Sequence, residues 1–242
     1  MNKISIILLF LIFQITKGQS NLDDLKKYIE NIENVSELYN LKNVKFKHFS
    51  VITAHTDIER DIDFGYKHHR IEIVPYDGYD MKLNIISKDD KIQTAWVSEF
   101  DSYKNKYLKI KIVIKNPDFL SRYVKKHNTL YYTKLTEQDF MHQITKEYVV
   151  GFGCGITGNN IPREAKKMLK FVKHKNRKKL QEYLTSFSPE LQALGTIGLL
   201  KIGKLSLMQK NIIEHLKKRN SIVSTCSGCL YGINIKFTEA IK

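Results

Sequence analysis

The sequence lacks the short motifs by which several large enzyme classes are recognised. It has no Gly-x-Ser-x-Gly elbow to present a nucleophilic serine and no His-Glu-x-x-His zinc motif. Gly151, Gly153 and Gly155 alternate along the chain, but without the strand-to-helix setting of a phosphate-binding loop or a dinucleotide fingerprint. The sequence therefore predicts none of these enzyme classes, and it predicts no cofactor.

Arginine and long apolar runs are also scarce. Only 6 of the 40 basic residues are arginines, whereas arginine interleaved with aromatic residues is the usual mark of nucleic-acid recognition. Nucleic acid is therefore not an expected partner. The one sustained apolar run, residues 4–15, is shorter than the ~20 residues that a membrane-spanning helix needs. No later stretch is longer, so we expect no transmembrane segment in the mature chain.

The first 20 residues have the three regions of a cleavable bacterial signal peptide. Lys3 supplies a positive charge, residues 4–15 form a short apolar core, and Thr16 and Gly18 are small residues at the −3 and −1 positions of a cut after Gly18. A cut after Ser20 is the alternative. We therefore expect residues 1–18 to be removed and the mature protein to work in the periplasm or outside the cell.

The region 19–115 is predicted to be a helix followed by an antiparallel sheet of about five strands. Apolar residues recur at helical spacing over residues 21–40. The β-favouring segments that follow are 44–52, 70–76, 81–87, 92–98 and 107–115. The turns between them are short, and short turns join antiparallel neighbours because a parallel crossover needs about a dozen residues. The last segment alternates most clearly, with isoleucines on one side and lysines on the other, and we expect one face of the sheet to be buried.

The region 116–242 is predicted to be mainly helical, which places the whole chain in the α+β class. Asn116 and Pro117 start a helix directly after the sheet, and Thr136 starts the next one. Short helices are then expected at 163–173, 177–185, from 188 onward and at 207–219. Two β-like segments, 221–225 and 230–237, end the chain. They leave open whether this end returns to the sheet and makes one domain of both regions.

The segment from Leu184 to Gly203, LTSFSPELQALGTIGLLKIG, resembles a HEAT-like helical hairpin. In that pattern a helix ends, a Ser-Pro-Glu turn starts the next helix, and small and large apolar residues alternate along it. Ala193, Gly195 and Gly198 would allow a neighbouring helix to approach closely. Solenoids need about three repeats to be stable alone, and no second clear copy is present, so a small helical bundle is expected. The resemblance implies binding of a protein or a peptide and brings no catalytic residues.

Basic residues concentrate in the C-terminal half of the chain. Between residues 163 and 219 there are 15 basic and 4 acidic residues. The densest run supplies the candidate anion-binding residues Lys173, Lys175, Arg177, Lys178 and Lys179. Such a run can bind acidic groups of a partner, or it can be a solvated lysine-rich helix face. The expected partner is another envelope protein or an anionic surface.

Three cysteines, Cys154, Cys226 and Cys229, are the sharpest candidates for chemistry. In an oxidising compartment two of them form a disulfide and leave one thiol over. Cys154 can bridge to either member of the Cys226-Ser-Gly-Cys229 motif, or the motif can close on itself. Two cysteines at this spacing can also cycle between dithiol and disulfide. A zinc site is the third option, with His142 or His215 as the fourth ligand.

A fainter candidate is the acidic row Asp57, Glu59, Asp61 and Asp63. In an extended segment these carboxylates point the same way and can bind calcium, but the glycine and the terminal glutamate of an EF-hand loop are missing. We therefore expect a solvated strand face or loop here.

These observations predict an exported, non-catalytic binding or scaffold protein of the cell envelope. The alternative is a thiol-redox or metal-dependent envelope enzyme that uses Cys226 and Cys229. The state of the thiols separates the two hypotheses, because an enzyme needs accessible, cycling cysteines whereas a scaffold keeps them bonded and inert.

Overall fold

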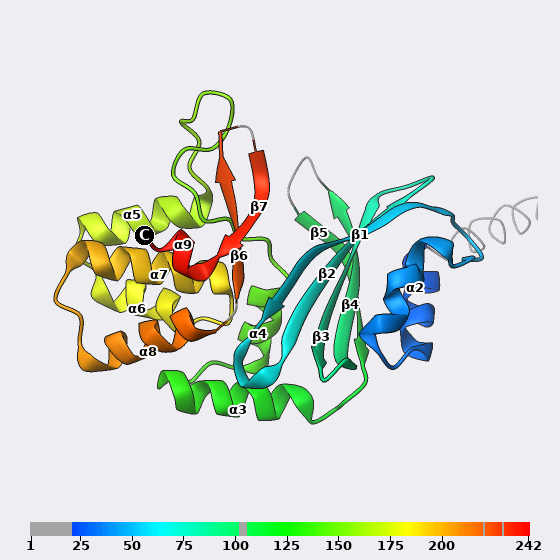
Figure 1. The fold of residues 1–242 in the computed structure, drawn as a ribbon, viewed down its shortest axis with the longest axis horizontal. Helices are drawn as coiled ribbons and strands as arrows, with labels where there is room; N and C mark the ends of the chain where they lie inside the picture. The colour runs from blue at the N-terminus through cyan, green and yellow to red at the C-terminus, as the bar shows by residue number, and fades with distance from the viewer. Residues whose placement is uncertain (1–20, 102–105, 220, 229) are drawn as a thin grey trace, which may run out of the picture. The chain divides into compact units, whose positions relative to one another are not determined.

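The computed structural model describes residues 21–101, 106–219, 221–228 and 230–242 (Figure 1). The predicted signal peptide lies outside the described residues. The chain forms two compact units, the first from the described part of Met1–Asp57 with Arg70–Lys115 and the second from Ile58–His69 with Asn116–Lys242. Within the described ranges, no helix has the length and apolar character needed to cross a bilayer.

The first unit contains the predicted helix and most of the predicted antiparallel sheet, whose first two strands have their connected ends in Ile58–His69 of the second unit. The helix is α2 (Asn21–Asn31), and a 3₁₀ helix, η2 (Val35–Asn43), follows it. The strands are β1 (Val51–Asp61), β2 (Lys67–Pro75), β3 (Asp80–Lys88), β4 (Lys91–Asp101) and β5 (Lys106–Ile114). They lie in the sheet in chain order, because each strand turns back beside the one before it. The predicted α+β class, with a helix, a five-stranded antiparallel sheet and then helices, is confirmed.

Two boundaries in this unit differ from the prediction. The helix expected over residues 21–40 ends at Asn31, and the first strand occupies Val51–Asp61 rather than 44–52. The helix is interrupted because η2 has a start of its own, where the Glu37 carboxylate accepts a hydrogen bond from the Asn34 backbone N–H at 2.8 Å. A glutamate three residues after an Asn cap is a helix-start signal that apolar spacing does not record.

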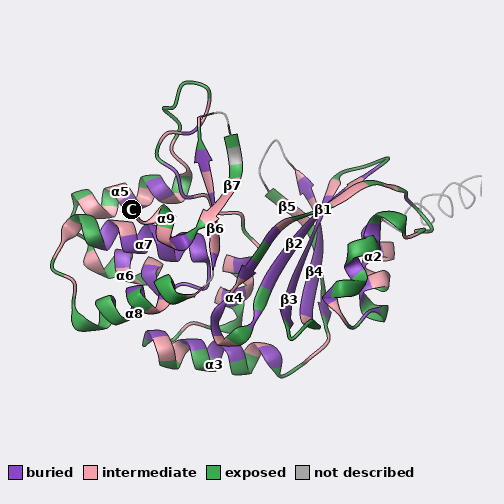
Figure 2. Cartoon of the chain, viewed as in Figure 1, coloured by how far each residue is buried: buried purple, intermediate pink, exposed green. Residues whose placement is uncertain are grey.

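The alternation in β5 buries fewer isoleucines than a simple inside–outside pattern suggests. Val113 is buried, while Ile110, Ile112 and Ile114 are all more than 40 % exposed. Helix α2 packs on β4 and β5. Its leucine and isoleucine residues are buried, and Figure 2 shows the buried stripe along the helix. Lys111 lies on this covered side and pairs with Asp23 of α2. The covered side of β5 therefore includes a half-buried lysine whose ammonium group pairs with a carboxylate.

The second unit is mainly helical. Its helices are α3 (Phe119–Tyr131), α4 (Glu137–Ile144), α5 (Arg163–Lys173), α6 (Arg177–Leu184), α7 (Pro189–Ile202), α8 (Leu207–Lys218) and α9 (Phe237–Ala240). The two predicted β-like segments form β6 (Ile222–Ser227) and β7 (Leu230–Lys236), which pair with each other in a separate two-stranded sheet. The described part of the chain's end therefore forms a sheet of its own. Bridges from Val150 and Cys154 to Thr225 and Gly228 align the glycine-rich segment with this small sheet instead.

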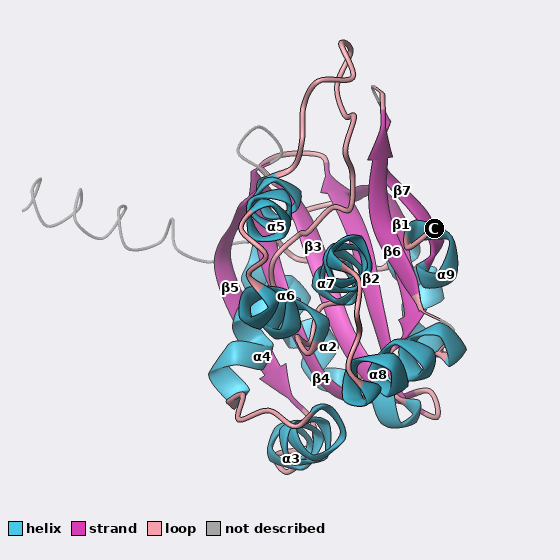
Figure 3. Ribbon diagram, turned by 90° about the vertical axis from the view of Figure 1, so that its left-hand side faces the viewer, coloured by secondary structure: helices cyan, strands magenta, loops and turns pink. Residues whose placement is uncertain are grey.

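Helix α7 is the central helix of this unit and contacts both α5 and α6 (Figure 3). The Ser188 hydroxyl caps its N-terminus and Pro189 occupies its first turn, as the Ser-Pro-Glu signal predicts. The predicted close approach is present at Gly195, where an added Cβ would clash with the backbone of Leu184 at the end of α6. Nearly the whole circumference of α7 is buried as a result.

Candidate functional site

The turn between β1 and β2 directs one carboxylate into the second unit. This turn is the 3₁₀ segment η3 (Asp63–Gly65), which the Ile62 N–H closes by donating to the Tyr66 carbonyl at 2.8 Å. Phe64 has a left-handed backbone conformation with φ of 67°, which is uncommon for an aromatic residue. Its ring contacts the Tyr123 ring edge-on at 5.6 Å, which helps to hold the turn. The Asp63 side chain is thereby buried.

Asp63 is the centre of a buried ionic network. Its Oδ1 atom accepts a hydrogen bond from Nε2 of His215 at 2.9 Å. Its Oδ2 atom accepts one from the Tyr131 hydroxyl at 2.9 Å and lies 3.1 Å from Nη1 of Arg219. Both carboxylate oxygens are therefore bonded within the protein, as a buried charge requires.

The expectation that the acidic row is solvated is wrong for Asp63, and the reason is the turn that follows β1. The strand ends at Asp61, so Asp63 no longer shares the side of the strand that carries the other carboxylates. Two of those carboxylates have partners on β2, since Asp57 lies 2.6 Å from Arg70 and Glu59 lies 3.0 Å from Lys67. Cross-strand pairs of this kind are ordinary stabilising contacts of a sheet.

The charge on Arg219 determines the ionisation of Asp63. Burial acts to raise the pKa of this carboxyl, but the Arg219 guanidinium and the bond from His215 outweigh burial and hold its pKa well below the ordinary value. Asp63 is therefore ionised at neutral pH. An ionised carboxylate only accepts hydrogen bonds, so the proton in the bond between Asp63 and His215 is on Nε2 of the imidazole.

His127 lies beside this network and is fully buried. Its Nε2 donates to the Thr185 carbonyl at 3.0 Å, and its ring lies 4.1 Å from the Phe187 ring between centroids. Its Nδ1 atom is 4.0 Å from Oδ2 of Asp63 and has no hydrogen-bond partner among the described residues. Burial lowers the pKa of His127 to about 4, so this imidazole is neutral at physiological pH.

A second buried ion pair lies in the same unit. Nη1 of Arg60 is 2.5 Å from Oε1 of Glu190, which is near the start of α7. The same carboxylate accepts hydrogen bonds from the Ser188 hydroxyl at 2.8 Å and from the Ser224 backbone N–H at 3.2 Å. The pair thus links the β1–β2 hairpin, α7 and β6, and such fully bonded pairs hold elements in register.

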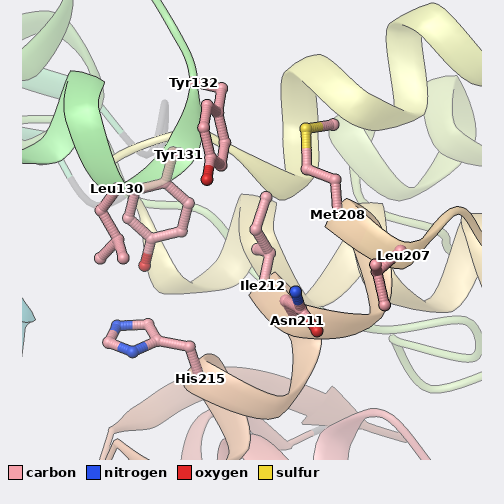
Figure 4. Close-up of a pocket in the computed structure, with 8 residues that line it drawn as sticks. All are labelled: Leu130, Tyr131, Tyr132, Leu207, Met208, Asn211, Ile212 and His215. Atoms are coloured by element: carbon pink, nitrogen blue, oxygen red, sulfur yellow. The ribbon is translucent and has the colours of Figure 1, made fainter.

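A pocket of about 440 Å³ opens beside the Asp63 network, between the end of α3 and helix α8 (Figure 4). Its apolar lining consists of Leu130, Tyr131, Tyr132, Leu207, Met208 and Ile212. Its two polar lining residues, Asn211 and His215, are one turn apart on α8. A ligand in this pocket can reach His215, whose side chain is 39 % exposed. It cannot reach Asp63 directly, because that side chain is only 2 % exposed.

The structure shows which of the possible disulfide pairings forms. Cys154 and Cys226 are at disulfide distance, with Cα atoms 5.5 Å apart, and both side chains are buried. Gly151 is required at its position because an added Cβ would clash with the Cys226 sulfur. Cys229 lies outside the described residues. Because Cys226 is bonded to Cys154, it is not free to cycle with Cys229 in this state.

The described residues that were considered for zinc, which exclude Cys229, do not form a metal-binding cluster. The described residues hold no cluster of three or more histidine, cysteine or acidic side chains that could bind a metal ion. His142 is 2.5 Å from the Lys146 ammonium group, and His215 is bonded to Asp63.

The anion-binding candidates lie where α5 meets α6, and they divide into two groups. Arg177 donates to the Gly203 carbonyl just after α7, and Lys179 pairs with Glu182 at 2.7 Å. Lys173, Lys175 and Lys178 are exposed, and their side chains make no hydrogen bond or ion pair to a described residue. These three lysines are therefore the candidates whose charges are directed to solvent.

Sequence reasoning considered Asp63 and His215 separately and missed the network that joins them. No sequence motif marks Tyr131 or Arg219 as functional. The residues of the Asp63 network come from a turn and from two helical regions that are far apart in the chain. The contact between Asp63 and His215 spans 152 residues, and no local spacing records such a contact. Neither a protein-family model, nor a curated protein sequence, nor a solved structure matches this chain.

Proposed function

We propose that the chain is an exported, non-catalytic binding protein of the cell envelope, and that lysines of its helical part hold it to an anionic surface. The proposal rests mainly on the ion pairs of the four acidic residues between 163 and 219. Each is already paired, Glu164 with Lys167, Glu182 with Lys179, Glu190 with Arg60 and Glu214 with Lys217. Internal acids therefore do not neutralise the remaining basic residues.

Nine lysines are left over, and we call them the basic surface. They are exposed and have no ion pair with a described residue: Lys166, Lys170, Lys173, Lys175, Lys178, Lys201, Lys204, Lys210 and Lys218. Near an anionic membrane each basic residue contributes about 1 kcal/mol of attraction, which is screened beyond ~8 Å at physiological salt. Several lysines together supply enough attraction for reversible surface binding.

The non-catalytic part of the proposal rests on the state of the groups that could do chemistry. Asp63 and Glu190 are buried and bonded on all sides. Cys226, which the enzyme hypothesis needs as an exposed thiol, is buried and paired with Cys154. The HEAT-like character of α6 and α7 supports the same class by analogy, because such hairpins bind other macromolecules.

Vesicle binding tests the proposal. The mature chain is mixed with phosphatidylcholine vesicles with and without phosphatidylglycerol, at low and at physiological ionic strength. The test variant carries Lys173→Gln, Lys175→Gln and Lys178→Gln. The matched control carries Lys42→Gln, Lys45→Gln and Lys47→Gln, which remove the same charge from exposed lysines of the first unit.

We expect binding only to the anionic vesicles, weaker at higher salt, and weakened at least tenfold in the test variant. The control variant should bind within about threefold of wild type. Binding that ignores salt, or that falls equally in both variants, would contradict the assignment to the basic surface.

A further inference from the structure

The pocket between α3 and α8 contains two polar groups without partners among the described residues. These are the Asn211 side-chain amide and Nδ1 of His215, neither of which makes a hydrogen bond there. The two residues are four positions apart on α8, so their side chains project from one face of the helix. Figure 4 shows both side chains on α8, with Leu130 and Tyr131 contributed by α3.

Asp63 determines what His215 can offer to a ligand. Oδ1 of Asp63 accepts the Nε2–H of His215 at 2.9 Å, and Arg219 at 3.1 Å keeps this carboxylate ionised. In the neutral imidazole the proton is then on Nε2, and Nδ1 is a hydrogen-bond acceptor. In this neutral form His215 offers the pocket an acceptor, Nδ1, and Asn211 offers an amide that can donate or accept.

The size and lining of the pocket limit the rest of the ligand. A volume of about 440 Å³ is near the lower end of the ~300–1,000 Å³ that small-molecule sites span. It suits a single ring with a short substituent. Tyr132 offers an aromatic face and Met208 a thioether, and both groups favour contact with an aromatic ring.

We propose that this pocket binds a small hydroxylated aromatic molecule, whose hydroxyl donates to Nδ1 of His215. A hydroxyl group carries the proton that this acceptor needs. A carboxylate has no proton to donate to Nδ1. A purely apolar molecule would leave both polar groups unpaired.

The test is a calorimetric titration of the mature chain with 4-ethylphenol, 4-ethylanisole and 4-ethylbenzoate. The three share the ring and the ethyl group and differ in the polar group. We expect 4-ethylphenol to bind, and 4-ethylanisole to bind about fivefold more weakly because its ether oxygen cannot donate. The benzoate should be weaker still. Equal affinity for the phenol and the anisole would overturn the role of Nδ1, and no binding of 4-ethylphenol would overturn the proposal.

Two tryptophan variants locate the binding site. Met208→Trp fills the pocket from a side chain that is 36 % exposed, and it leaves the bonds of Asp63 intact. Leu200→Trp places the same side chain at an exposed leucine of α7 outside the pocket. Met208→Trp should abolish binding of 4-ethylphenol while Leu200→Trp retains it, with the same melting temperature in both variants. Retained binding in Met208→Trp would contradict the pocket assignment.

Discussion

The Asp63 carboxylate lies 3.1 Å from the Arg219 guanidinium, and the side chains are only 2 % and 6 % exposed. This contact joins the turn after β1 to the residue that follows α8, within the second unit. Each charge is costly to bury alone, and the two are stable there because they compensate each other and because Tyr131 and His215 satisfy the remaining carboxylate lone pairs.

Asp63→Asn is expected to lower the free energy of unfolding by about 3–5 kcal/mol, because it leaves Arg219 buried without a counter-charge. Urea denaturation measures the loss. Asp118→Asn is the matched control, since it makes the same change at an exposed carboxylate before α3 and should alter stability by less than about 0.5 kcal/mol. Similar losses in the two variants would show that the buried pair does not contribute as described.

Acid should weaken the fold between pH 6.5 and about 4. Burial lowers the pKa of His127 from 6.5 to about 4, so within this window the unfolded chain binds a proton that the folded chain does not. The contribution of neutral His127 to the free energy of unfolding is fully present above pH 6.5. It is lost as the pH falls toward 4, at about 1.4 kcal/mol per pH unit or roughly 3 kcal/mol in all. Asp63, whose folded pKa is lowered by Arg219 despite burial, continues the loss below its ordinary value of 3.8.

The variant His127→Gln separates these two groups. Glutamine keeps an N–H donor for the Thr185 carbonyl and does not titrate. Urea denaturation at a series of pH values should therefore give a flatter stability profile between pH 6.5 and 4 for the variant than for wild type. An unchanged slope would mean that another group binds the proton.

Gly195→Ala should destabilise the second unit by about 1–3 kcal/mol, because the new methyl group meets the Leu184 backbone, which cannot turn away. Gly198→Ala is a graded comparison, since its methyl group meets the flexible ends of Leu180 and Met168. Thermal unfolding should show the smaller loss for Gly198→Ala. The reverse order would contradict the close approach of α6 and α7 at Gly195.

Much of the fold follows from local signals in the sequence. Strands β2, β3 and β4 are bounded by turns such as Asp77-Gly78, and alternation between the turns places each strand within a few residues. The Ser188-Pro189 start of α7 is equally local, because the cap and the proline act on their own helix. Such elements depend on neighbours in sequence, so the sequence is sufficient to place them.

Most features that sequence reasoning missed depend on distant contacts. The break between α2 and η2 is the exception, because the local bond from the Asn34 N–H to Glu37 marks it while apolar spacing continues across it. Asp63 reads as the last member of an acidic row, and its burial depends on Tyr131, His215 and Arg219. The pairing of Cys154 with Cys226 was one of several possibilities, because connectivity is set by the fold and not by spacing.

Cysteine mapping tests most directly whether this chain is a binding protein with inert thiols or a thiol enzyme. The mature protein, purified from an oxidising compartment, is alkylated without reductant, digested and analysed by mass spectrometry. We predict a Cys154–Cys226 linked peptide and an alkylated Cys229, unchanged by mild reductant because the bonded sulfur atoms are buried. A readily reduced Cys226–Cys229 bridge would contradict the account and make that motif the active centre.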